Sequence, residues 1–192
     1  MADHSVFSTR QRSELRRKLL LAREQFASDP RAPRAAEALA ANLLRVLGEI
    51  DPQLLGVYWA IGSEFDAIAA LEASALHKLP LALPYARRVP REMHYCAWDG
   101  KPPTLTDECG LPAASGPQVQ PDLVLVPCVG FTRSGWRIGF GGGYFDRWLA
   151  ANPHVTTVGV AWAVSEVSDE EFERQGHDQG LMLVVTEQGV VG

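Results

Sequence analysis

Cysteine is scarce in this sequence of 192 residues, and its three cysteines, Cys96, Cys109 and Cys128, form no CxxC pair. Their odd number and their spacing argue against a disulfide framework, so we expect a reducing compartment. A long apolar run is missing too. No stretch approaches the roughly 18 to 20 uncharged residues of a membrane span, and residues 1–12 contain no apolar signal core. We therefore expect a cytoplasmic protein with no membrane partner.

Positive charge is not in excess either. The chain carries 18 lysine and arginine residues against 23 acidic residues, a formal net charge of −5. No nucleic-acid partner is expected, and any anion must be bound by a local cluster. The five histidines show no HxxxH spacing, and the sequence has no GxSxG motif. These absences argue against a zinc site and against a serine nucleophile.

Short apolar runs alternate with helical patterns along the chain, which favours a parallel sheet covered by helices. Strands are predicted at residues 54–60, 79–84, 93–98, 123–126, 155–161 and 181–186, and helices at 15–26, 35–47, about 63–76, 144–151 and 166–173. Residues 99–121 hold five prolines and are predicted as an irregular loop. We expect residues 1–192 to form an α/β fold, a single three-layer domain with a mainly parallel sheet and helices on both faces. Ligands of such folds bind beyond the carboxyl ends of the strands.

The first predicted helix is amphipathic and basic. Its apolar stripe consists of Leu15, Leu19, Ala22 and Phe26. Arg12 and Arg16 lie one turn apart and share another face, within the densest positive cluster of an acidic chain. That face is either a solvated polar surface or one that binds phosphate, and the pattern alone leaves both open.

The most informative segment is PCVGFTRSGWRIGFGGGYFDRWL, residues 127–149, between a predicted strand and a predicted helix. Its glycines at 135, 139 and 141–143 let the backbone approach a bound group closely. The unpaired N–H groups at the start of the helix favour an anion at the same place. GFGGGY fits neither GxGxxG nor GxxxxGK[ST], so dinucleotide and ordinary P-loop sites are not indicated. A tight structural turn is the alternative interpretation of the glycines.

Charged residues accompany these glycines. Arg133, Arg137 and Arg147 offer the fork geometry that suits phosphate oxygens, and Asp146 is the carboxylate beside them. Mg²⁺ commonly takes one or two carboxylates together with phosphate oxygens and water. The segment therefore indicates a magnesium–nucleotide site, although Asp146 could simply stabilise the start of the helix.

These residues resemble the signature of the 5-formyltetrahydrofolate cyclo-ligase family, in which a strand ends in proline and is followed by phenylalanine and then G-x-R-[LI]-G-[YF]-G-x-G-Y-[YF]-D. The chain supplies Pro127, Phe131 and the ungapped segment from Gly135 to Asp146 in that order. Further positions that resemble the family are Arg12 and Arg16 in the first helix, Glu64 after the first strand, and Asp178 before the final strand with Thr186 and Glu187.

The resemblance implies a set of site residues. ATP would be bound by Arg12, Arg16, Arg137, Ile138, Gly139, Phe140, Gly141, Gly142, Gly143 and Tyr144. Folate would be bound by Trp59, Glu64, Gly141, Gly142, Gly143 and Tyr144, with Arg137 and Tyr144 catalytic and with Asp146 and Asp178 holding Mg²⁺. Taken alone, Trp59 could be a core residue, Glu64 a helix-start residue and Asp178 a surface carboxylate.

Two positions depart from the family pattern. The stretch Gly110-Leu111-Pro112-Ala113-Ala114 lacks the acidic residue that the family commonly has there, and Ser165 stands where a glutamine is common. We expect both positions on the walls of the substrate pocket, whereas the phosphate and metal positions are intact.

The reaction that the resemblance implies is the ATP- and Mg²⁺-dependent closure of 5-formyltetrahydrofolate to 5,10-methenyltetrahydrofolate. Phosphorylation of the formyl oxygen would create a leaving group, and ADP and phosphate would be released. ATP and the folate are then the partners, and we expect a monomer. The alternatives are a cyclo-ligase-like protein that binds folate or nucleotide without this activity, and an ATP-using enzyme with another small substrate.

Overall fold

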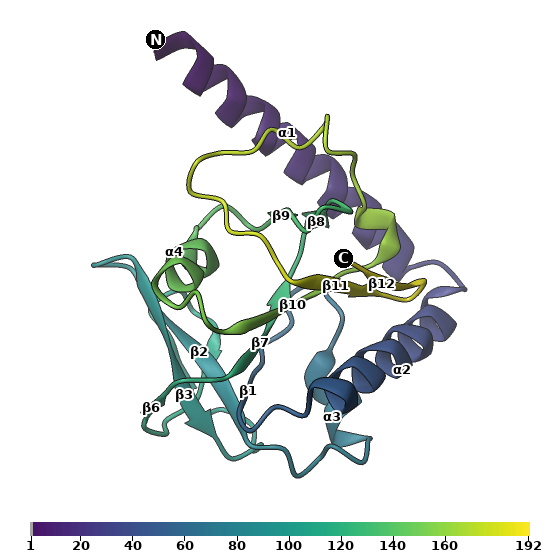
Figure 1. Ribbon diagram of the computed structural model, residues 1–192, viewed down its shortest axis with the longest axis vertical. Coiled ribbons are helices and arrows are strands. Elements are labelled where there is room, and N and C mark those ends of the chain that lie inside the picture. The colour runs from purple at the N-terminus through teal and green to yellow at the C-terminus, as the bar shows by residue number, and fades with distance from the viewer. Residues whose placement is uncertain (1) are drawn as a thin grey trace.

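A mixed sheet of eight strands forms the centre of the computed structural model, which describes residues 2–192 and the side chains from Arg10 onward. Its order is β12-β11-β10-β7-β1-β2-β3-β6 (Figure 1). The strands are β1 (Leu55–Gly56), β2 (Leu81–Arg87), β3 (Glu92–Trp98), β6 (Gln118–Val119), β7 (Leu123–Pro127), β10 (Thr156–Val160), β11 (Leu183–Thr186) and β12 (Gly189–Val191). From β11 to β2 the strands run parallel, whereas β12, β3 and β6 pair antiparallel at the edges.

Helices cover both faces of this sheet. They are α1 (Ala2–Ala27), α2 (Ala32–Ile50), α3 (Ala67–Glu72) and α4 (Tyr144–Ala151). Leu43 of α2 and Ile68 of α3 belong to the same buried cluster as Leu125 of β7. Trp148 of α4 packs with Val126 in the cluster on the other face, because neighbouring residues of a strand point to opposite sides. The predicted three-layer α/β fold is confirmed.

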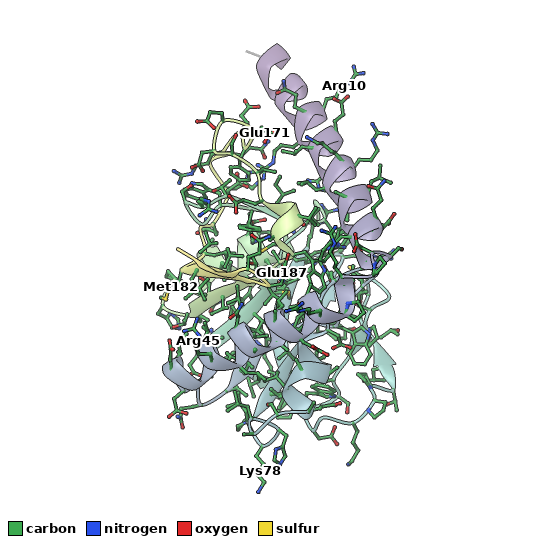
Figure 2. The ribbon with its side chains drawn as sticks, turned by 90° about the vertical axis from the view of Figure 1, so that its right-hand side faces the viewer. Arg10, Arg45, Lys78, Glu171, Met182 and Glu187 are labelled. Carbon is green, nitrogen blue, oxygen red and sulfur yellow. The ribbon has the colours of Figure 1, made fainter. Side chains whose placement is uncertain are left out.

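Helix α1 crosses the carboxyl-end side of the sheet. It packs on the hairpin formed by β8 (Gly130–Phe131) and β9 (Arg137–Ile138), which directly follows β7 (Figure 1). Leu19 of α1 lies in a third cluster with Ile138, Val167 and Phe172. A Cβ atom at Gly130 would lie 2.6 Å from Leu19 Cδ1, so this close approach of helix and hairpin favours glycine. On the outer side of α1, Arg10 pairs with Glu14 in solvent (Figure 2).

Some predicted boundaries are wrong. The helix predicted at 166–173 is an irregular segment, because the Val167 N–H bonds the Phe131 carbonyl and Phe172 inserts under α1. Gly48 does not end α2, which continues to Ile50. The strand predicted at 54–60 forms its ladder only in β1.

The segment predicted as an irregular loop, residues 99–121, contains three short strands. They are β4 (Leu105–Thr106), β5 (Pro112–Ala113) and the edge strand β6. A 3-10 turn, η1 (Ala163–Ser165), follows β10. In the part of the chain that the structure describes, no helix combines the length and the apolar character needed to cross a membrane.

Candidate active site

A cavity of about 490 Å³ lies beyond the carboxyl ends of the parallel strands, among α1, the β8–β9 hairpin and the start of α4. Its walls include the predicted site residues Arg12, Arg16, Trp59, Glu64, Arg137, Gly139, Phe140, Gly141, Gly142, Gly143, Tyr144, Asp146 and Asp178. Ile138 is the exception among the predicted residues. It is fully buried in β9 and packs beneath α1, which makes it a core residue that supports the cavity wall.

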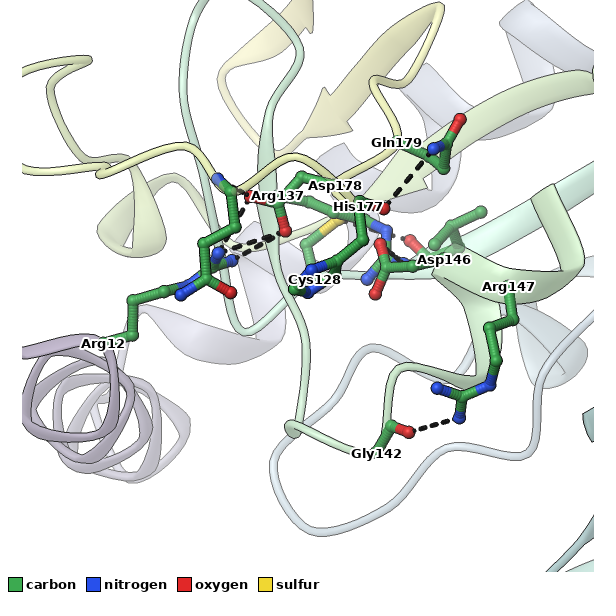
Figure 3. A network of polar contacts seen from close by, with 11 residues as sticks. Arg12, Cys128, Arg137, Gly142, Asp146, Arg147, His177, Asp178 and Gln179 are labelled. Carbon is green, nitrogen blue, oxygen red and sulfur yellow. Dashed lines mark hydrogen bonds and ion pairs between the residues drawn. The ribbon is translucent and has the colours of Figure 1, made fainter. Parts of the chain in front are cut away.

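One end of the cavity is basic, and we call it the arginine end. Arg12 of α1 reaches both carboxylate oxygens of Asp178, with Nη1–Oδ2 at 2.8 Å and Nη2–Oδ1 at 3.1 Å (Figure 3). Arg16, one turn further on, donates from Nε to the Gly139 carbonyl at 2.7 Å. Burial and the neighbouring charge of Arg12 lower the pKa of Arg16. The shared face of these arginines therefore points into the cavity.

Residues 139–143, between β9 and α4, form a loop that we call the glycine loop, and it contacts Arg16. A Cβ atom at Gly141 would lie 3.3 Å from Arg16 Cζ, and the φ of Gly141 is 95°, in the left-handed region. Both facts favour glycine, since a side chain would push the guanidinium away and strain the backbone. The loop brings its backbone close to whatever the arginines hold.

A second arginine–aspartate pair lies at the start of α4. Arg137 of β9 donates from Nη2 to Asp146 Oδ1 at 2.8 Å, and only 3% of its side chain is exposed. Asp146 sits in the first turn of α4, whose N-cap is Gly143 with no side-chain hydrogen bond. The N–H groups of that turn thus lack a capping side chain, which leaves them suited to an anion.

Two other arginines that were predicted to bind phosphate are bonded to groups of the protein instead. Arg133 is exposed and pairs with Glu166 at 2.7 Å, outside the cavity lining. Arg147 donates to the Gly142 carbonyl at 2.6 Å (Figure 3). It also donates to the Arg91 carbonyl at 2.8 Å. Neither arginine is among the described residues that line the cavity, and Arg147 instead ties the loop at Gly142 to the β2–β3 turn.

Another part of the cavity is lined mainly by apolar and aromatic side chains around Glu64, and we call it the glutamate end. Trp59 lines it and meets Trp98 edge to face at 6.4 Å. Glu64 Oε2 accepts the Ile61 N–H at 2.9 Å, while Oε1 lies 3.8 Å from Arg23 Nη1. Burial raises the pKa of Glu64, and the Ile61 N–H and the charge of Arg23 oppose that shift.

Some residues of the site were missed in the sequence. Arg23 contacts Glu64, and its 11-residue spacing from Arg12, three helical turns, is the signal that could have revealed it. Asp107 accepts the N–H groups of Ala86, Cys109 and Leu111 and so shapes the loop at the cavity wall. The two nearby partners follow the local turn pattern of an aspartate, whereas the sequence gives no signal for the contact with Ala86 of β2.

Tyr144, at the first position of α4, lies at the cavity wall. The Tyr144 hydroxyl and Cys109 Sγ form a hydrogen bond at 3.2 Å, and this contact raises the pKa of Tyr144. The Arg147 guanidinium lies 5.5 Å from the centre of its ring. The aromatic ring is thus fixed from both sides.

Neither departure from the family pattern lies where we expected it. Ala113 and Ser165 are buried, at 1% and 0% exposed, and neither is among the described residues that line the cavity. Leu111 and Pro112, next to Ala113, do line it. The expectation that both departures touch the pocket wall is therefore wrong, because Ala113 and Ser165 are packed behind it.

Metal ligands are sparse. Among the side chains that the structure describes, from Arg10 onward, no three His, Cys, Asp or Glu residues gather into a metal-binding group. Asp146 and Asp178 nevertheless line the same cavity as Arg12 and Arg137. This donor set lacks the ligands of an all-protein cage and fits Mg²⁺, which binds through one or two carboxylates and takes its other ligands from phosphate and water.

An α/β sheet with a cavity at its carboxyl edge, lined by arginines in one part and by apolar and aromatic side chains in another, is typical of the α/β proteins that bind small ligands at that edge. The model of the 5-formyltetrahydrofolate cyclo-ligase family matches residues 8–187. A 5-formyltetrahydrofolate cyclo-ligase of Mycolicibacterium smegmatis is 31% identical over 196 residues, covering 96% of this chain and 98% of the relative. The chain belongs to the 5-formyltetrahydrofolate cyclo-ligase family, and it is an enzyme with that family's activity.

Solved structures agree in fold. The 5,10-methenyltetrahydrofolate synthetase of Aquifex aeolicus matches with a TM-score of 0.73 and 27% identity, covering 94% of this chain and 91% of that one. A 5,10-methenyltetrahydrofolate synthetase from Mycoplasma pneumoniae matches with a TM-score of 0.71 and 18% identity, covering 92% and 98%. The second likeness shows the fold alone.

Proposed function

We propose that the cavity binds ATP at its arginine end and 5-formyltetrahydrofolate at its glutamate end, and that ring closure occurs between them. The observation that carries this proposal is convergence: residues from α1, the segment after β1, the glycine loop and the segment before β11 line one cavity.

The arginine end offers positive charge and hydrogen-bond donors that can bind a triphosphate. Arg16 and Arg137 offer planar, permanently charged donors, the glycine loop offers close backbone, and the uncapped start of α4 offers N–H groups. Arg12 pairs with Asp178, and Arg137 pairs with Asp146. Phosphate oxygens therefore compete with these carboxylates for the same donors.

Asp146 and Asp178 are the residues that would hold Mg²⁺ in this site. When bound, the ion would neutralise charge on the transferred phosphoryl group. We infer a partner exchange on nucleotide binding, in which the arginines release the carboxylates and take phosphate oxygens. The carboxylates would thereby become available to hold the metal, since both oxygens of Asp178 are bonded to Arg12.

The reaction needs the formyl oxygen and the γ-phosphorus to be aligned, and it needs no nucleophile from the protein. The formyl oxygen attacks the γ-phosphorus and ADP leaves, which makes the formyl carbon electrophilic. The neighbouring folate nitrogen then attacks that carbon, loses its proton, and phosphate departs with the former formyl oxygen. Arg137 would stabilise the charge on the moving phosphoryl group, and Tyr144 would orient it beside the folate.

Cys128 takes no part in this scheme. The thiol is fully enclosed, and burial raises the pKa of Cys128 to about 12. A neutral buried thiol is a poor nucleophile.

The direct experiment follows the methenyl product by its absorbance in a reaction with 5-formyltetrahydrofolate, ATP and Mg²⁺. We expect product only when all three are present. Product that forms equally well in the presence of excess chelator would remove Mg²⁺ from the proposal, and ATP binding without product would favour the alternative of a binding protein.

A further inference from the structure

Helix α1 directs one row of side chains at the cavity. At 100° per residue, Arg12, Arg16, Leu19 and Arg23 fall within about 60° of one another around the helix. The first two arginines reach the cavity itself. Arg23, three turns after Arg12, is 3% exposed and lies behind the wall rather than on it.

From there Arg23 contacts two residues that do line the cavity. Its Nη1 lies 3.8 Å from Glu64 Oε1, and its Cζ lies 5.6 Å from the centre of the Phe140 ring. Its Nε donates to Ser63 Oγ at 3.0 Å, which fixes the plane of the guanidinium. One buried cation thus joins the segment after β1 to the glycine loop.

Glu64 depends on that cation. Only 4% of its side chain is exposed, and an isolated carboxylate at such a place would take up a proton rather than stay charged. Its Oε1 has no hydrogen-bond donor among the described residues. The carboxylate is thus charge-balanced by Arg23 at 3.8 Å, yet it keeps an acceptor for a donor that arrives from the cavity.

We propose that Arg23 is a positioning residue for the folate: it holds the Glu64 carboxylate charged and in place at the cavity wall, and it sets Phe140 of the glycine loop beside it. The inference rests on the proposed function and deepens it, because it links the folate contact to the loop that holds the nucleotide. Arg23 touches neither substrate and acts through Glu64.

The test is steady-state kinetics in both substrates for Arg23→Met, Arg23→Lys and the matched control Arg17→Met, an exposed arginine of the same helix. We expect Arg23→Met to raise the KM for 5-formyltetrahydrofolate by about tenfold or more, with kcat and the KM for ATP changed less than about threefold. Arg23→Lys should restore most of the loss, and Arg17→Met should match the wild type.

A purely structural role predicts something else: less folded enzyme, hence a lower apparent kcat at unchanged KM. That result for Arg23→Met, or a wild-type KM for the folate, would overturn the proposal. A wild-type enzyme that forms no methenyl product would instead overturn the proposed function, so the two failures are distinguishable.

A double-mutant cycle tests whether Arg23 acts through Glu64. If Arg23 acts through Glu64, adding Arg23→Met to Glu64→Gln should change the KM for the folate less than about twofold. Removing both charges together also avoids an uncompensated buried ion, so the double variant should fold even where Arg23→Met does not. Additive penalties in the cycle would contradict action through Glu64.

Discussion

The two ends of the cavity hold their charges in opposite ways. At the arginine end, Arg12–Asp178 and Arg137–Asp146 are both closed at 2.8 Å. At the glutamate end, the Arg23–Glu64 pair stays open at 3.8 Å, and Glu64 Oε1 has no hydrogen bond among the described residues. A closed pair must be broken before a ligand can use either partner, whereas an open pair is ready for one.

This difference predicts different consequences of substitution. Changes at the arginine end should alter phosphoryl transfer and the dependence of nucleotide binding on metal, because ligands there displace existing bonds. Changes at the glutamate end should alter the KM for the folate, because a ligand there adds a bond that the protein leaves unmade.

The largest effect is expected for Arg137→Ala. Loss of a preorganised charge at the transferred group typically lowers kcat by about 10²- to 10³-fold. The fold should survive because Asp146, 18% exposed, can be hydrated when its partner is gone. Steady-state kinetics and thermal unfolding test both points, with Arg133→Ala as the matched exposed arginine. Equal losses of activity and stability would assign Arg137 a structural role.

A smaller effect is expected for Glu64→Gln. A hydrogen bond to a charged group contributes about 1.5–3 kcal/mol, so the KM for the folate should rise by roughly 10- to 100-fold. The KM for ATP should stay as it is. Asp66→Ala is the control, because Asp66 caps α3 by accepting the Ala69 N–H. That variant should lose about 1 kcal/mol of unfolding free energy without changing either KM. A rise in both KM values for Glu64→Gln would contradict the separation of the two ends.

A change of a few fold is expected for Asp178→Asn. With its charged partner removed, Arg12 is freed for phosphate, so ADP should bind roughly three- to tenfold more tightly in the presence of chelator. With Mg²⁺ present, the variant should gain less from the metal than the wild type. Calorimetry with ADP measures both. An unchanged affinity without metal would mean that the Arg12–Asp178 pair does not compete with the nucleotide.

The smallest effect concerns the cysteines. Burial raises the pKa of Cys128 to about 12, so at pH 8 only about one such thiol in 10⁴ is ionised. Burial also raises the pKa of Cys96. Iodoacetamide should therefore modify Cys109, at the cavity wall, and the folate should slow that reaction. Mass spectrometry of the treated enzyme identifies the modified residue, and labelling of Cys128 before Cys109 would contradict the burial described.

The sequence predicted the parts that are local. The segment from Gly135 to Asp146 combines a loop, a helix start and charged residues within 12 positions, and Arg12 and Arg16 share a face by helical spacing alone. For the same reason the layers of the fold could be read from runs of apolar residues. These features depend on neighbours in the chain.

What could not be predicted depends on partners far along the chain. Phe172 leaves a helical pattern because it packs under α1, and Ile138 sits in the signature yet belongs to the core. The sequence around Arg147 predicts a phosphate ligand, but in the fold its guanidinium donates to the Arg91 carbonyl, which comes from a distant turn. Tertiary contacts decide each case, and no local pattern records them.

The most direct test measures two products in one reaction of the wild-type enzyme: ADP, by chromatography, and the methenyl product, by absorbance. A shared cavity in which the phosphoryl group passes straight to the formyl oxygen predicts equal amounts of both at every time point, and neither without the other substrate. Steady ADP formation in the absence of folate, or methenyl product in the absence of ATP, would contradict it.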